Sequence, residues 1–105
     1  MLLPEGFELF VILEGDRSIL FFISGLPENA QQEAEALIRL IQEKGNSIVG
    51  GRRVSHDDGL FELRGEYVRV FYKVSADDRI VLIDGLLPDQ GEEHLDKIRR
   101  KAELL

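Results

Sequence analysis

The chain has 105 residues, of which 44% are hydrophobic and 31% are charged, a balance typical of one folded domain rather than of a disordered segment. It contains no cysteine, which excludes disulfides, thiolate metal sites and cysteine nucleophiles and fits a cytoplasmic protein. The net charge is −7 and the pI about 4.8, which argues against broad nucleic-acid binding, because such binding requires Lys and Arg to neutralise phosphates.

The acidic charge is unevenly distributed along the chain. Residues 1–45 carry a net charge of −5, residues 46–73 of +1 and residues 74–105 of −3. The middle segment can therefore hold a local anion site. No apolar run approaches the roughly 18 residues that a membrane span needs, and no basic region precedes an apolar stretch at the N-terminus, so neither a membrane segment nor a signal peptide is expected.

The first part of the chain combines one predicted strand with an ambiguous segment. Residues 7–13 alternate apolar and other side chains and predict a strand, and residues 14–16 predict a turn. Asp16 or Ser18 can cap a short helix over residues 18–23. A strand is the alternative for those residues, because Ile-Leu-Phe-Phe-Ile favours β structure.

Residues 27–44 are the clearest predicted helix. Pro27 suits its first turn, Gly45 and Asn46 stop it, and the core-facing stripe comprises Ala30, Ala34, Leu37, Ile38 and Ile41. Residues 46–58 are predicted to form a loop with a short extended piece at Ile48 and Val49.

The remainder predicts three strands and a helix. The strands cover residues 60–64, 67–73 and 79–84, with a turn at residues 75–78, and Asp84-Gly85 ends the last strand. The helix covers residues 90–103, with an apolar stripe of Leu95, Ile98, Ala102 and Leu105. This order predicts a single α+β domain over residues 1–105, with helices packed on one face of an antiparallel sheet.

Residues 59–72 are the most informative stretch, because they form a predicted hairpin with unequal faces. Successive strand side chains point to opposite faces of a sheet. One face is therefore expected to be apolar, formed by Phe61, Leu63, Val68, Val70 and Tyr72. The other face is expected to carry Glu62, Arg64 and Arg69.

Three segments, one at each of the last three predicted strands, resemble the core of a known toxin superfamily. They are Gly-Leu-Phe-Glu-Leu-Arg at residues 59–64, Tyr-Val-Arg-Val-Phe-Tyr at residues 67–72 and Arg-Ile-Val-Leu-Ile at residues 79–83. They resemble the RelE/HigB superfamily, in particular its phage-derived, HigB-like branch, over about residues 18–105. Members are small ribosome-dependent mRNA endonucleases of type II toxin–antitoxin systems. The resemblance implies a four-stranded antiparallel sheet with N-terminal helices on one face and a C-terminal helix.

The resemblance also implies a catalytic site. Arg64 and Arg69 would clamp an RNA phosphate, whereas the alternative is a structural cross-strand ion pair between Glu62 and Arg69. His56 or Glu62 would move protons, although ion pairing is the other role of Glu62. Arg52 and Arg53 would bind substrate from the loop, or form a flexible basic loop in which Asp57 and Asp58 neighbour His56. No cofactor is implied, and the implied partners are a cognate antitoxin and the ribosome with its mRNA.

The segment after the last predicted strand departs from the superfamily. Active relatives carry basic residues or a tyrosine there, whereas this chain reads Asp-Gly-Leu-Leu-Pro-Asp-Gln at residues 84–90. The alternative function is therefore a catalytically inactive, acidic, phage-type protein of the same fold that acts by binding a protein partner, and an exposed Leu86-Leu87 pair favours it. A homo-oligomer with a structural role is a third hypothesis that no residue pattern selects. No metal-ligand pattern is present.

Overall fold

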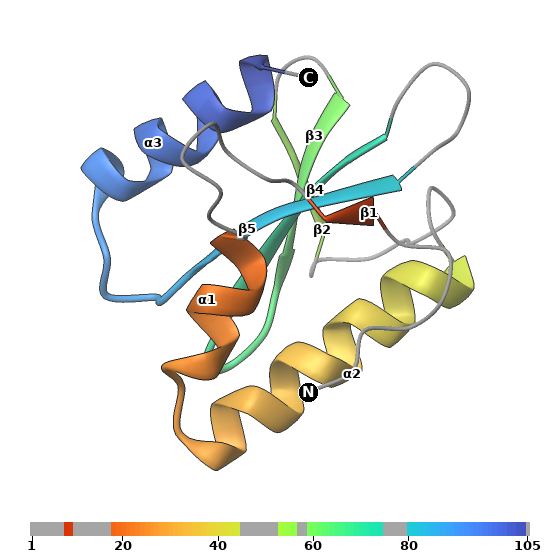
Figure 1. Ribbon diagram of the computed structural model, residues 1–105, viewed down its shortest axis with the longest axis vertical. Helices are drawn as coiled ribbons and strands as arrows, with labels where there is room; N and C mark the ends of the chain where they lie inside the picture. Colours follow the sequence, from red (N-terminus) through yellow and green to blue (C-terminus); the bar gives the residue numbers. More distant parts are fainter. Residues whose placement is uncertain (1–7, 10–17, 45–52, 57–58, 75–79, 105) are drawn as a thin grey trace.

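Five strands form one sheet in the computed structural model, which describes residues 8–9, 18–44, 53–56, 59–74 and 80–104. The strand order is β1-β5-β4-β3-β2 (Figure 1). The strands are β1 (Glu8–Leu9), β2 (Arg53–Ser55), β3 (Leu60–Arg64), β4 (Arg69–Val74) and β5 (Ile80–Leu86). The helices are α1 (Ser18–Ser24), α2 (Glu28–Lys44) and α3 (Glu92–Glu103). The chain is thus an α+β protein, as predicted.

Strands β2 to β5 are a four-stranded antiparallel sheet, but not the four strands that the sequence predicts. The predicted first strand is described only at Glu8 and Leu9, which pair parallel with Val81 and Leu82 of β5. The fourth antiparallel strand is β2, which lies in the segment predicted as a loop, and that prediction was wrong for residues 53–55. Arg-Val-Ser is too short to show an apolar alternation, and its pairing with residues 61–63 of β3 is a long-range contact.

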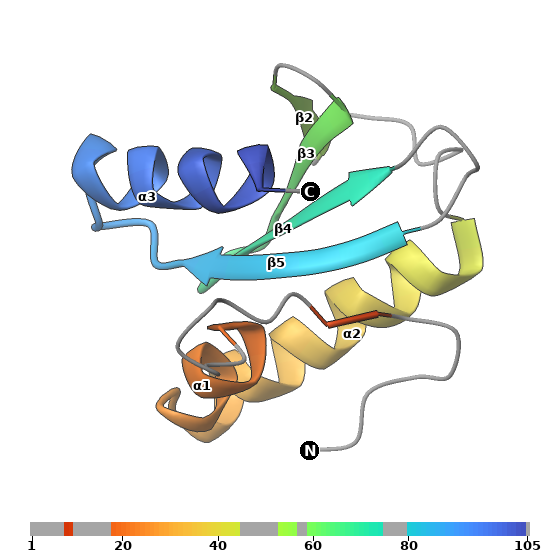
Figure 2. The same ribbon diagram turned by 45° about the horizontal axis from the view of Figure 1, so that its top comes forward.

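The helices cover both faces of the sheet, which corrects the predicted one-sided packing. Figure 2 shows α3 on one side of the sheet and α1 with α2 on the other. The physical reason is that β4 and β5 are apolar on both faces. Val70 and Tyr72 face the N-terminal helices, while Phe71 and Ile83 belong to a second buried cluster with α3.

The first core lies between the sheet and the N-terminal helices. The stripe predicted for α2 is buried there in full, as are Ile19 and Ile23 of α1. Ile19 and Ile23 stand one helical turn apart, so both reach the same core. The ambiguous residues 18–23 are therefore helical, and the strand alternative is excluded. The predicted apolar hairpin face is confirmed, because its five residues all pack in or against this core.

The second core lies between the sheet and α3. Ile98 and Ala102 of the predicted α3 stripe are buried in it, and Leu95 packs against it. Strand β5 continues to Leu86 rather than ending at Asp84-Gly85, and Leu86 is buried here, so the prediction of an exposed Leu86 was wrong. Ile83 is an extra residue opposite the step from Phe71 to Tyr72, a bulge that places both Ile83 and Asp84 on the α3 side.

A carboxylate from α2 holds the turn between β3 and β4. Glu33 accepts hydrogen bonds from the backbone N–H groups of Glu66, Tyr67 and Val68 at 2.7–2.9 Å. A Cβ atom at Gly65 would overlap this carboxylate. Gly65 therefore permits the contact between the hairpin and α2.

Several predicted features lie outside the described residues: the rest of the first strand, the Asp16 cap, residues 45–52, the turn at residues 75–78 and Leu105. No helix in the described part of the chain is long and apolar enough to cross a membrane.

Candidate functional site

Glu62 on β3 is a buried carboxylate surrounded by three basic side chains. It is 1% exposed. Its Oε2 accepts a hydrogen bond from Nε of Arg64 at 2.6 Å and lies 3.6 Å from Nε of Arg69, while Oε1 lies 2.9 Å from Nε2 of His56. We call these four residues the Glu62 cluster. They lie on the α3 side of the sheet, because Glu62 pairs across the strands with Phe71.

The pKa of Glu62 results from opposing effects. Burial alone would raise the pKa, since it disfavours the charged carboxylate. Hydrogen bonds from Arg64 and His56, together with the positive charges of Arg64 and Arg69, outweigh burial and lower the pKa below its ordinary value of 4.5. Glu62 is therefore ionised at neutral pH and is a weak base, so the cluster favours a positioning role for it over proton abstraction.

The two arginines keep part of their hydrogen-bonding capacity. Their side chains are 46% (Arg64) and 29% (Arg69) exposed, and both direct Nε toward Glu62. Among the described residues, their terminal Nη groups have no partner. Because two adjacent guanidinium N–H donors match the spacing of two phosphate oxygens, these ends can bind a phosphate.

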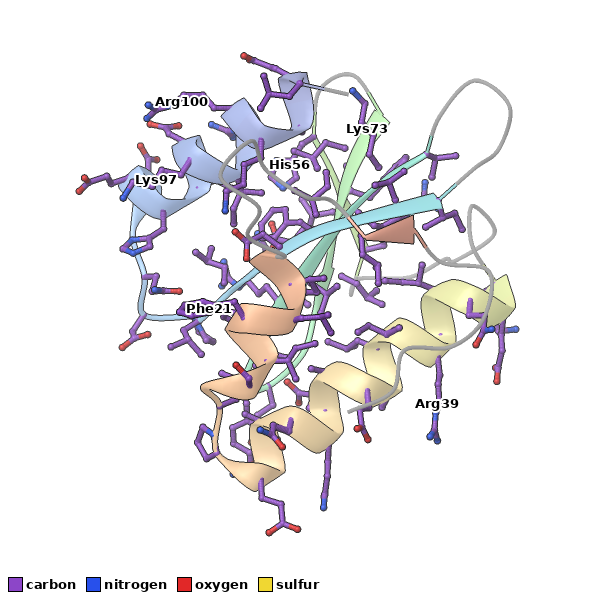
Figure 3. All side chains as sticks on the ribbon, viewed as in Figure 1. Phe21, Arg39, His56, Lys73, Lys97 and Arg100 are labelled. Carbon is purple, nitrogen blue, oxygen red and sulfur yellow. The ribbon has the colours of Figure 1, made fainter. Side chains whose placement is uncertain are left out.

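Glu62 also determines the tautomer of His56. An ionised carboxylate only accepts hydrogen bonds, so Nε2 of His56 carries the hydrogen in the 2.9 Å contact. In a neutral imidazole the proton-accepting atom is then Nδ1. The side chain is 12% exposed, and its ring lies 5.7 Å from the ring of Phe71 between centroids. Figure 3 labels His56 within the upper part of the sheet.

The substrate-binding residues predicted from the loop do not join this cluster. Arg53 pairs with Leu63 and so lies on the opposite face, where its guanidinium stacks 3.9 Å from the centroid of Phe61. Phe61 stacks in turn on Tyr72. Burial raises the pKa of Tyr72, although the charge of Arg53 opposes this. Arg52, Asp57 and Asp58 lie outside the described residues.

Residues 84–90, which form the end of β5 and the turn after it, add no described cation or base to the Glu62 cluster. Asp84 is paired with Lys101 of α3 at 2.5 Å, and the side chain of Gln90 accepts a hydrogen bond from the backbone of Leu87. These contacts join the segment to α3 and to itself, not to the Glu62 cluster. It does not supply the second proton donor that a two-group acid–base mechanism uses.

The structure brings together four of the six predicted site residues, namely Glu62, Arg64, Arg69 and His56. The Glu62–Arg69 pair was anticipated, but the shorter contacts to Arg64 and His56 were not. Phe71, which lies against His56, was missed as a site residue. The alternation of the hairpin placed Phe71 on the same face as Arg69, and this was the available signal.

The described residues contain no group of three or more His, Cys, Asp or Glu side chains suited to a metal ion. Comparison of the chain with protein-family models and with curated proteins finds no match.

Proposed function

We propose that this chain is a RelE/HigB-like ribonuclease that binds an RNA phosphate at Arg64 and Arg69 and cleaves beside it. The observation that carries the proposal is the Glu62 cluster, in which one buried carboxylate orients two arginines and a histidine on one face. A site held in position before its ligand arrives loses little free energy to reorganisation, which favours transition-state binding. The resemblance supplies the substrate class, mRNA on the ribosome in the cytoplasm, and an antitoxin as partner.

In the proposed reaction His56 is the base and the arginines stabilise charge. Nδ1 of His56 takes the proton of the ribose 2′-hydroxyl, and the 2′-oxygen attacks phosphorus. The bond from phosphorus to the 5′-oxygen breaks, and the leaving 5′-oxygen takes a proton from water. The products are a 2′,3′-cyclic phosphate and a 5′-hydroxyl. Glu62 acts as a positioning residue, because it holds Nε2 of His56 and so leaves Nδ1 to accept the proton.

Induction of the chain in growing bacteria tests this proposal. The wild type is expected to arrest growth and to leave cleaved transcripts. Arg64→Ala and His56→Gln are each expected to reduce cleavage by roughly 100-fold or more. Arg39→Ala, at an exposed position on α2 (Figure 3), removes the same charge and should behave as the wild type. Full cleavage by an Arg64→Ala, Arg69→Ala double variant would show that the site is assigned wrongly.

A second candidate function is protein binding without catalysis. It is favoured by residues 84–90, where Asp84 of β5 is neutralised by Lys101 and no described base faces the cluster. In that case induction would cause no arrest despite good soluble expression, and a purified partner complex would persist in Arg64→Ala. The two candidates are thus separated by transcript cleavage, which only the first predicts.

A further inference from the structure

A pocket of about 450 Å³ lies between α1, the end of β5 and α3. It is separate from the proposed RNA site, since none of the four residues of the Glu62 cluster lines it. Its volume falls within the range of roughly 300–1,000 Å³ that small-molecule sites occupy.

The walls of the pocket are mainly apolar. They include Phe21 and Phe22 of α1, Leu26 after it, Leu87 after β5 and Ile98 of α3. The ring of Phe22 occupies the place where a Cβ atom of residue 85 would lie, so Gly85 allows α1 to pack directly on β5. Phe21 is 79% exposed, and an exposed phenyl ring at a pocket can be covered by a ligand at little structural cost.

The polar side of the pocket carries excess positive charge. Lys97 and Lys101 of α3 line it together with a single carboxylate, Asp84. Asp84 is already neutralised by Lys101 at 2.5 Å. Lys97 has no ion-pair partner in the described part of the chain, although Glu93 precedes it by four positions. The lining is therefore net positive on a chain whose net charge is −7.

We propose that this pocket binds a small molecule with an apolar, ring-sized body and one anionic group, such as an aromatic carboxylate or sulfonate. The body would lie between Phe21, Phe22 and Ile98, and the anion would lie at Lys97. The charge complementarity comes from Lys97, because Asp84 and Lys101 neutralise one another. Figure 3 shows Phe21 on α1 and Lys97 on α3, the two helices that border the pocket.

Two matched fluorescent probes test the proposal. 8-Anilinonaphthalene-1-sulfonate has an aromatic body and one sulfonate, and N-phenyl-1-naphthylamine has the same rings without the charge. We expect saturable one-to-one binding of the anionic probe to the folded full chain, with weaker binding of the neutral probe. Lys97→Gln should lower the affinity for the anionic probe roughly three- to tenfold and leave the affinity for the neutral probe unchanged. Phe21→Ala should lower the affinity for both probes.

The controls separate this site from non-specific dye binding. Arg100→Gln removes the same charge from the same helix at an exposed residue that does not line the pocket, and should leave both affinities unchanged (Figure 3). Since partly folded proteins also bind the anionic dye, each variant must retain a cooperative thermal transition. Amide chemical shifts should change on binding at Phe22, Gly85 and Ile98.

Three outcomes would overturn the proposal. The first is that the folded wild type shows no saturable binding of the anionic probe. The second is that Lys97→Gln and Arg100→Gln lower the affinity for that probe equally. The third is that the amide chemical shifts change only in other parts of the chain. Because the pocket and the Glu62 cluster share no residue, absence of RNA cleavage leaves this inference unaffected, and absence of dye binding leaves the proposed ribonuclease unaffected.

Discussion

Glu62 shows how one buried charge organises its surroundings. A buried carboxylate without partners is strongly destabilising, but here two hydrogen bonds and a third basic group surround it. The arrangement favours the ionised form despite burial. The consequence for function is that both arginines and the histidine are held on one face before any ligand binds.

The lowered pKa of Glu62 makes its contribution to stability dependent on pH. A lowered folded-state pKa stabilises the fold fully above the ordinary value of 4.5, and this contribution is lost as pH falls through the lower folded value. We expect Glu62→Gln to reduce the free energy of unfolding by about 1–3 kcal/mol at neutral pH. The penalty should shrink at about pH 3. Urea unfolding followed by circular dichroism measures both.

Glu66→Gln is the matched control for this comparison. Glu66 is exposed in the β3–β4 turn, and its side chain has no partner among the described residues. Its replacement should change the free energy of unfolding little at either pH. An equal penalty for Glu62→Gln at both pH values would contradict the assignment of an ionised, stabilising carboxylate.

At the scale of elements, the hairpin depends on α2 for its turn. Three consecutive backbone N–H groups converge on Glu33, and hydrogen bonds to an ionised acceptor are stronger than neutral ones. The turn orients β3 and β4, whose adjacent ends carry Arg64 and Arg69. A residue far away in sequence therefore helps to position the candidate site.

We expect Glu33→Ala to reduce the free energy of unfolding by about 2 kcal/mol, because three N–H groups lose their acceptor. Hydrogen exchange at Glu66, Tyr67 and Val68 should accelerate. Glu35→Ala, on the same helix, removes a carboxylate that has no partner in the described part of the chain, and it should have little effect. Unchanged exchange at the three amides in Glu33→Ala would refute the role of Glu33.

Gly65→Ala gives an independent test of the same contact. The added Cβ would displace the Glu33 carboxylate, so the double variant should lose little more stability than either single variant. Additive losses would mean that Gly65 and Glu33 act separately. Gly91→Ala is the control, since a Cβ at Gly91 meets nothing within 4 Å.

At the scale of the whole molecule, one sheet is shared by two cores. Phe71 and Tyr72 are neighbours in β4, yet they belong to cores on opposite faces. Strain or loss of packing on one face therefore reaches the other through the same strands. We expect the two cores to unfold together rather than as separate units.

Ile98→Ala tests this coupling from the side of α3. Ile98 is buried against the sheet, and its truncation is expected to cost about 2–4 kcal/mol. The urea midpoint of unfolding should fall by the same amount whether it is followed by circular dichroism or by tyrosine fluorescence, which includes Tyr72 in the first core. Separate transitions for the two probes would contradict a shared cooperative unit. Leu104→Ala, at an exposed position after α3, should be close to neutral.

Local periodicity was enough to predict much of the fold. The α2 stripe repeats every three to four residues, and the hairpin alternates every second residue, so burial on one face follows directly from the residue order. The pairing of Glu62 with Arg69 across a tight hairpin was accessible for the same reason. In each case the interacting residues are neighbours along one element or across one turn.

Periodicity failed where contacts join distant segments. The three-residue strand β2 is too short to show a hydrophobic period. Its register with β3 places Arg53 on one face of the sheet. The next residue after the strand, His56, contacts Glu62 on the other face. The position of α3 depends on the course of the chain after β5. It also depends on Ile83, which the bulge places on the side of the sheet that α3 covers.

The order of residues alone predicted the α+β class, the α2 helix, the two faces of the hairpin and the position of Arg64 and Arg69 on its charged face. Contacts between distant segments set which side of the sheet α3 covers, which basic residues reach Glu62 and where the pocket between α1 and α3 lies. The periodicity of apolar side chains is a property of one segment. Strand register and the packing of layers, in contrast, are set by the free energy of the whole chain.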